Sequence, residues 1–227
     1  MGEETMVDQM WVARATTWEL LALTLRYPDG TLADAVASGE WALAAAEVAD
    51  VLDLTLPEGW LEGVPGAPAA GIEPPDPAAL LSDLRVEATR LFVGAPEPAC
   101  PPFEGVWRAK EEGVQPLLFV NPHSMEVERF CRACGLGRPE GTNEPLDHAA
   151  TECELLEHLA LRAAGAPVPE SAPAAEDLPG GSPAAAYETF LAEHARVWMP
   201  AFAEHLAADA RVPLYRACAH LLAAAVA

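Results

Sequence analysis

The feature that most restricts the fold of this chain is a recurring pair in which a helix-capping residue precedes proline. The pair occurs at Asp76-Pro77, Asn121-Pro122 and Ser182-Pro183. Proline suits the first position of a helix, because its missing N–H would be unpaired there and its fixed φ is already helical. After each pair, apolar residues recur at three- and four-residue steps, which is typical of an amphipathic helix. Since no segment shows the alternation expected of a strand, the sequence predicts an all-α fold.

We expect a single domain over residues 1–227, with eight to ten helices packed around one core. Predicted helices cover residues 10–27, a short stretch after Thr31, and residues 40–54, 77–94, 122–134, 145–160 and 183–198, with a last helix from Pro213. Pro200 is expected to kink or end the helix that contains it. Two segments rich in proline and glycine, at about 57–77 and 166–182, are predicted to be loops or linkers.

The formal net charge of −22 excludes a nucleic-acid binder that works by neutralising phosphates, and it favours a basic partner. The longest apolar tract, residues 217–227, is interrupted by His220 and is shorter than the roughly 20 residues that a membrane span requires. Glu3, Glu4 and Asp8 precede the first apolar run, so no secretory signal is expected. These features predict a cytoplasmic protein without membrane insertion.

The chain has five cysteines, an odd number, which we interpret as reduced thiols. The one close pair, Cys131 and Cys134, lies within a helical pattern rather than after a strand. That position favours two small core residues over a zinc or redox site. We therefore expect no metal and no cofactor.

Residues 143–148 are predicted to open a helix, with Pro145 at its first position after a cap at residue 143 or 144. Asp147 would then lie in the first turn, where free N–H groups and the helix dipole favour an ionised carboxylate. Flanked by Glu144 and next to His148, this carboxylate could bind the guanidinium of an arginine. The alternative is that Asp147 is only a cap and His148 an ordinary core or surface group.

A peptide-binding groove also needs apolar anchors. Leu91, Phe92, Phe103 and Trp107 can supply them, although core packing is the commoner role of each such residue. Together with the acids, they predict a groove for a segment that is both basic and apolar.

An enzyme is the competing interpretation. A metal-dependent all-α hydrolase would use Asp147, His148, Glu152 and His158, but the two histidines are ten residues apart on one predicted helix, roughly 15 Å along its axis. They cannot share one ion, and no nucleophile–base signature or Gly-rich phosphate loop is present in the sequence. A third alternative is a structural subunit of an oxidoreductase complex.

Several motifs, taken in order, resemble the TorD/DmsD family of cytoplasmic chaperones for exported molybdenum oxidoreductases, which is related to NarJ. The motifs are Glu19-Leu20-Leu21-Ala22 with Tyr27-Pro28, Arg90-Leu91-Phe92-Val93-Gly94, Pro101 to Trp107, Gly135-Leu136, Asn143 to His148, Trp198 to Phe202 and Pro213 to Ala217. They extend over nearly the whole chain.

This resemblance implies a non-enzymatic, all-helical chaperone. Its partner would be the twin-arginine leader peptide of a molybdopterin-containing catalytic subunit, whose export it delays until the cofactor is inserted. The implied contact residues are Asp147 and His148, with Leu91, Phe92 and Trp107 at neighbouring groove positions and Arg14 joining from the first helix. An acidic surface would attract the basic part of the leader, and an aromatic groove would bury its apolar part. Either a monomer or a homodimer that swaps segments through residues 166–182 is expected.

Overall fold

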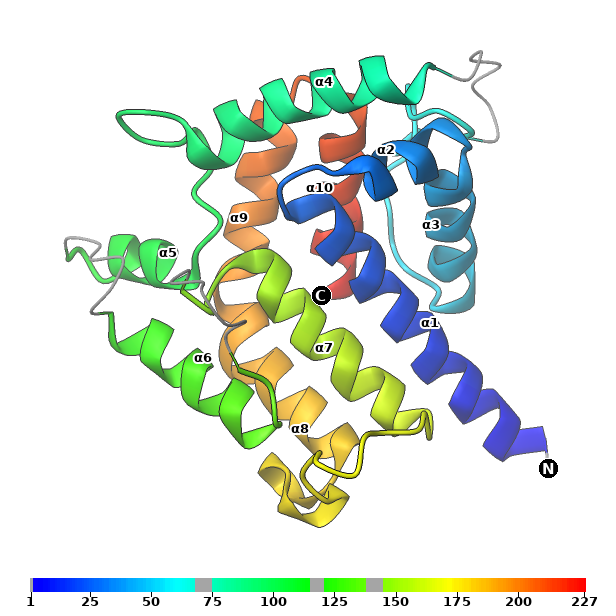
Figure 1. The fold of residues 1–227 in the computed structure, drawn as a ribbon, viewed down its shortest axis with the longest axis vertical. Coiled ribbons are helices and arrows are strands. Elements are labelled where there is room, and N and C mark those ends of the chain that lie inside the picture. Colours follow the sequence, from blue (N-terminus) through cyan, green and yellow to red (C-terminus); the bar gives the residue numbers. More distant parts are fainter. Residues whose placement is uncertain (1, 68–74, 115–120, 138–144) are drawn as a thin grey trace.

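The computed structural model describes residues 2–67, 75–114, 121–137 and 145–227, and in this part of the chain it is all-helical (Figure 1). The helices are α1 (Gly2–Leu25), α2 (Gly30–Ala37), α3 (Glu40–Val51), α4 (Pro77–Ala88), α5 (Glu104–Glu111), α6 (Pro122–Ala133), α7 (Ala149–Ala163), α8 (Pro183–Phe190), α9 (Arg196–Asp209) and α10 (Pro213–Ala225). The described residues form no strand, and Phe103 and His148 make an isolated antiparallel bridge. The predicted all-α fold is confirmed.

The capping pairs begin helices as predicted. Asp76, Asn121 and Ser182 each accept a hydrogen bond from a backbone N–H of the following first turn, at 2.9, 2.9 and 3.1 Å. In each case proline occupies the start of the helix, where no hydrogen bond is lost. Local sequence is therefore sufficient to define the starts of α4, α6 and α8.

The predicted start of α7 at Pro145 was wrong. The helix begins at Ala149, and His148 is its N-cap, with Nδ1 accepting a hydrogen bond from the N–H of Ala150 at 3.1 Å. Asp147 precedes the helix because its carbonyl oxygen accepts the N–H of Glu104 at 3.0 Å, at the start of α5. A contact between distant segments thus overrides the local proline signal.

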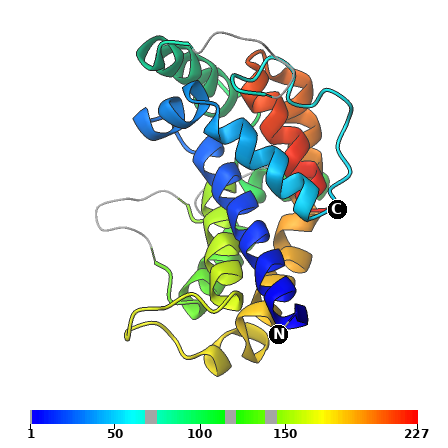
Figure 2. The ribbon, with the colours of Figure 1, turned by 90° about the vertical axis from the view of Figure 1, so that its right-hand side faces the viewer.

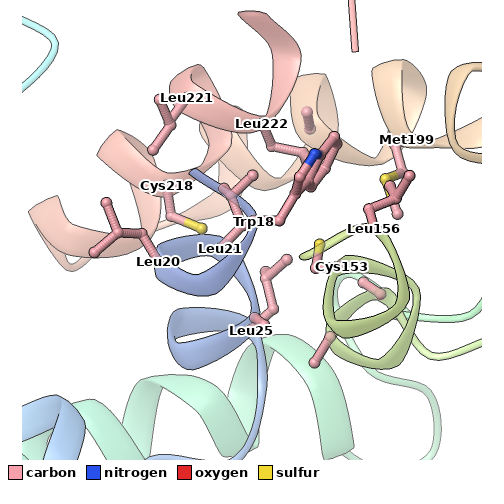
Figure 3. Packing of buried hydrophobic residues seen from close by; sticks show 14 of the residues in the cluster. Trp18, Leu20, Leu21, Leu25, Cys153, Leu156, Met199, Cys218, Leu221 and Leu222 are labelled. Carbon is pink, nitrogen blue, oxygen red and sulfur yellow. The ribbon is translucent and has the colours of Figure 1, made fainter. Parts of the chain in front are cut away.

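The core lies where α1 and α7 run side by side against α9 and α10 (Figures 1 and 2). Figure 3 shows Trp18 and Leu21 of α1, Leu156 of α7 and Met199 of α9 within this core. All four side chains are almost completely buried. Around them, one apolar cluster extends through the described residues from Ala15 to Val226.

Pro200 lies inside α9 and does not end it. Immediately before α9, residues Leu191–Ala195 form a π-helical turn, a wider turn that often accompanies a local disturbance of helical hydrogen bonding. The helical path therefore continues from α8 through Pro200 and carries His194, Trp198 and Phe202 into the core.

The segment 166–182 contains only two short 3₁₀ turns, Ala175–Asp177 and Pro179–Gly181. It is not a free linker, because Leu178 is buried in the core and Arg162 donates a hydrogen bond to the carbonyl of Pro173 at 2.8 Å. In the other predicted loop, Leu61 and Val64 are also core residues. None of the described helices combines the length and apolar character needed to cross a membrane.

Candidate binding cleft

A cleft of about 1490 Å³ lies between α5, α7 and the proline-rich segment that precedes α5, and the ends of α1 and α6 border it. Apolar and aromatic side chains make up much of its lining, including Phe92, Pro98, Pro102, Phe103, Val106, Trp107 and Leu136. Such a volume exceeds the roughly 300–1,000 Å³ of ordinary small-molecule pockets. The cleft can therefore accommodate an extended or helical segment of another polypeptide.

Backbone and side-chain hydrogen bonds fix the wall of the cleft. The indole N–H of Trp107 donates to the carbonyl of Pro101 at 2.7 Å. The next carbonyl, that of Pro102, accepts the N–H of Ala149 at 2.8 Å, which attaches the proline-rich segment to the start of α7. Because the proline-rich segment is bonded both to Trp107 of α5 and to the start of α7, the aromatic lining has a defined position before any ligand binds.

Asp147 lies behind this wall and does not line the cleft. It is 1% exposed, and its Oδ2 accepts hydrogen bonds from the N–H of Gly105 at 3.0 Å and from the hydroxyl of Ser124 at 2.5 Å. Burial raises the pKa of Asp147, an effect that the hydrogen bonds from Ser124 and Gly105 oppose. Its carboxylate therefore accepts a hydrogen bond from the first turn of α5. The sequence had instead predicted that Asp147 would lie in the first turn of the helix that follows it.

His148 is the member of the predicted acid–imidazole pair that borders the cleft. Its ring packs edge-on against Phe103 with centroids 5.2 Å apart. Burial lowers the pKa of His148 to about 4. The imidazole is therefore neutral near neutral pH, which matches its role as acceptor for the N–H of Ala150.

The structure brings Phe92, Phe103, Trp107 and His148 together around one cleft. Leu91 lies in the core and is not part of the lining. Glu144 lies outside the described residues.

Arg14 is elsewhere. Its guanidinium lies over the ring of Trp11 at 4.5 Å and pairs with Glu188 at 3.7 Å, beside a separate and smaller pocket. It does not line the cleft, so the expectation that it joins the same groove fails. The length of α1 explains this result, because the end of α1 that borders the cleft is three turns further along, at Leu25.

The polar side of the cleft was not predicted from the sequence. Thr151, Glu154 and His158 of α7 line it together with Arg26 at the end of α1 and His205 of α9. The signal for the first three was available, since they recur at three- and four-residue steps on one helical face after His148. The contributions of α1 and α9 come only from the tertiary fold.

Several carboxylates, those of Glu154 and Glu157 of α7 and Glu19 of α1, lie close together where α7 packs against α1. Burial raises the pKa of Glu154, and the nearby guanidinium of Arg26 partly offsets this effect. Burial, followed by repulsion from Glu19 and Glu154, raises the pKa of Glu157 to about 7. A cation close to these groups would therefore be attracted to them.

The residues of the hydrolase alternative do not form a metal site. Among the residues that the structure describes, no three His, Cys, Asp or Glu side chains are grouped so that they could hold an ion. Glu152 is fully buried and accepts a hydrogen bond from the indole of Trp198 at 3.0 Å. Cys131 and Cys134 are buried free thiols, as predicted from their helical setting.

In the described residues, fold and cleft together define a helical protein with a large cleft lined by aromatic side chains. The sequence matches the family described as "Nitrate reductase delta subunit" over residues 41–204, and the chain belongs to that family. A curated relative is the chaperone protein TorD of Vibrio cholerae serotype O1, which is 28% identical over 139 residues. The match covers 61% of this chain and 57% of the relative, so the chain spans little more than half of that protein's length. These findings confirm the family resemblance that the motifs indicated.

Proposed function

We propose that this protein is a cytoplasmic maturation chaperone, not an enzyme. In this proposal it binds the twin-arginine leader of a molybdopterin-containing oxidoreductase subunit and delays its export until the cofactor is inserted. The family and the chaperone relative support the general role. The observation that carries the choice of ligand is the cleft, which is large, apolar and bordered by acids.

The apolar part of the leader would occupy the wall formed by Phe92, Phe103 and Trp107. These rings line the cleft, and Trp107 is further supported by edge-on contacts with Phe202 and His205. Buried aromatic anchors of this kind commonly supply most of the free energy of a peptide interface. Leu91 supports this wall from the core.

The arginines of the leader need carboxylates that are accessible. Glu154 and Glu97 are the acids that line the cleft in the described residues, whereas the carboxylate of Asp147 is already bonded within the protein. We therefore assign the arginine contact to Glu154 and assign Asp147 to positioning of α5. The net charge of −22 would accelerate the approach of such a cationic segment.

Calorimetry with a synthetic peptide that carries paired arginines followed by an apolar stretch tests the proposal. Glu154→Gln and Phe103→Ala are each expected to weaken binding about tenfold or more, which corresponds to about 1.4 kcal/mol. Glu47→Gln and Leu43→Ala, at exposed positions of α3, are the matched controls and should bind normally.

A peptide in which lysine replaces both arginines should bind more weakly, because lysine cannot form a bidentate pair with a carboxylate. Equal affinity of wild type, Glu154→Gln and Phe103→Ala for the paired-arginine peptide would contradict the cleft as its site. If the protein were instead a structural subunit, the isolated chain would bind no leader peptide and would remain associated with a partner in size-exclusion chromatography.

A further inference from the structure

Two carboxyl groups lie directly behind the aromatic wall of the cleft, and the proposed binding role does not use either of them. Glu104 is the first residue of α5, and Glu152 lies in the first turn of α7. Both residues are 0% exposed. The two side chains lie within hydrogen-bonding reach of each other, and two ionised carboxylates in such a place would repel each other strongly.

The hydrogen-bond partners of the two groups differ. Glu104 accepts from the guanidinium of Arg108 at 2.7 Å and lies 3.0 Å from Nδ1 of His194. It therefore has partners that stabilise a negative charge. Glu152 has no such cation, since its Oε2 accepts the indole N–H of Trp198 at 3.0 Å and its Oε1 has no donor within reach.

A buried carboxyl oxygen that accepts no hydrogen bond and lies next to an ionised carboxylate is in surroundings that favour its protonated form, in which it can donate a hydrogen bond. We propose that Glu152 carries a proton in the folded protein and donates it to Glu104, so that one shared proton joins α7 to α5. The donor is Oε1 of Glu152, while Oε2 remains the acceptor for Trp198. This bond completes the hydrogen bonding of both groups.

The shared proton would position the cleft wall, a consequence that rests on the proposed function. Phe103 is the N-cap of α5 and directly precedes Glu104, and Trp107 lies one turn further along the same helix. The other links of this end of α5 to its surroundings include the bonds of Gly105 and Glu104 to Asp147. Loss of the proton would place two charges between α5 and α7 and push the wall away.

The titratable groups around Glu152 agree with this assignment. Burial raises the pKa of Glu152 well above its ordinary value, and the carboxylates of Glu104 and Asp147 raise it further, against the opposing bond from Trp198. The remaining neighbours are the Cys131 thiol of α6 and the Cys153 thiol of α7, whose own pKa values are raised by burial. Arg108 and His194 face Glu104.

Comparison of wild type with Glu152→Gln tests the proton directly, because Gln reproduces a donor and an acceptor but cannot ionise. Glu152 is protonated in the fold and ionised in the unfolded chain above about pH 4.5, so its contribution to stability is lost as pH rises towards the raised pKa. In chemical denaturation, the ratio of unfolding constants, wild type over variant, is expected to rise by about tenfold per pH unit from about pH 5 until the pH reaches the raised pKa of Glu152.

Glu47→Gln, on the exposed face of α3, should give a ratio that does not change in this way. A pH-independent ratio for Glu152→Gln would overturn the proposal, and so would a Gln variant that does not fold. This measurement involves no ligand, so it stands even if the leader peptide does not bind.

Hydrogen exchange and peptide binding test the link to the cleft. Above the raised pKa, amides of α5 in wild type should exchange faster than in Glu152→Gln after correction for intrinsic rates, and the paired-arginine peptide should bind wild type more weakly than the variant. Equal protection of α5 in both proteins would overturn the positioning role. Absence of peptide binding to either protein at any pH would contradict the proposed function alone.

Discussion

Asp147 and Glu157, two acids only ten residues apart, differ in their surroundings. Asp147 accepts hydrogen bonds from Gly105 and Ser124, and these donors partly offset the effect of burial on its pKa. Glu157 is half-buried beside other carboxylates and lacks comparable compensation. The chemistry of an acid in this protein therefore depends on which segments the fold places next to it.

Glu157→Gln is expected to make the protein more stable at about pH 8 and to leave stability nearly unchanged at about pH 4. The pKa of Glu157 is raised from 4.5 to about 7 in the fold, so wild type loses stability as pH rises from the unfolded value through the folded one. Urea titrations of both proteins across this range measure the effect. A variant less stable than wild type at about pH 8 would contradict the assignment; Glu47→Gln is the exposed control.

At the scale of elements, the helices are positioned partly by segments that have no helical pattern. Gly39, which precedes α3, and Gly66, in the predicted loop, both have positive φ, and their backbones touch. A Cβ on Gly66 would lie 2.2 Å from Cα of Gly39. The loop is thus packed against the start of α3, which its proline and glycine content did not reveal.

Gly66→Ala should destabilise the protein by about 2 kcal/mol or more, because it adds a clash with backbone atoms to the strain of positive φ. Thermal and urea denaturation measure the change. Gly30→Ala, at the start of α2 with nothing within 4 Å of the added Cβ, is the matched control and should be nearly neutral or slightly stabilising. Similar effects of the two substitutions would mean that the loop does not contact α3.

At the scale of the whole molecule, one apolar core connects most of the helices. The cluster joins Trp18 of α1, Trp41 of α3, Leu84 of α4 and Tyr215 of α10. The polar atoms of these large side chains are also paired, as when the Trp18 indole donates to the hydroxyl of Tyr187 at 2.8 Å. A core of this extent predicts that the described helices unfold together.

Leu21→Ala, at a fully buried site of α1, should therefore lower the free energy of unfolding by about 2–5 kcal/mol. The loss should shift a single transition, seen at the same urea concentration by far-UV circular dichroism and by tryptophan fluorescence. Leu43→Ala, which is 57% exposed on α3, should change stability by no more than about 0.5 kcal/mol. Two separate transitions would contradict a single domain.

Much of the fold could be predicted from local sequence. Capping at Asp76, Asn121 and Ser182 depends on neighbours in the chain, and so does the apolar spacing that follows each of them. The start of α7 could not be predicted in this way, because Asp147 bonds to α5 some forty residues away. For the site, the aromatic wall of Phe92, Phe103 and Trp107 was anticipated, and the α7 acid Glu154 was not.

The sequence by itself determined most of the helices, the absence of a strand pattern and the family motifs, since these rest on residues close together in the chain, whereas α5 and the start of α7 were not predicted. Only the tertiary structure decided which acid reaches the cleft. In the folded protein, Asp147 is buried and bonded to α5, Glu154 lines the cleft, and Glu152 is buried next to Glu104. The physical reason is that solvation and charge partners, which set the behaviour of a carboxyl group, come from segments distant in sequence.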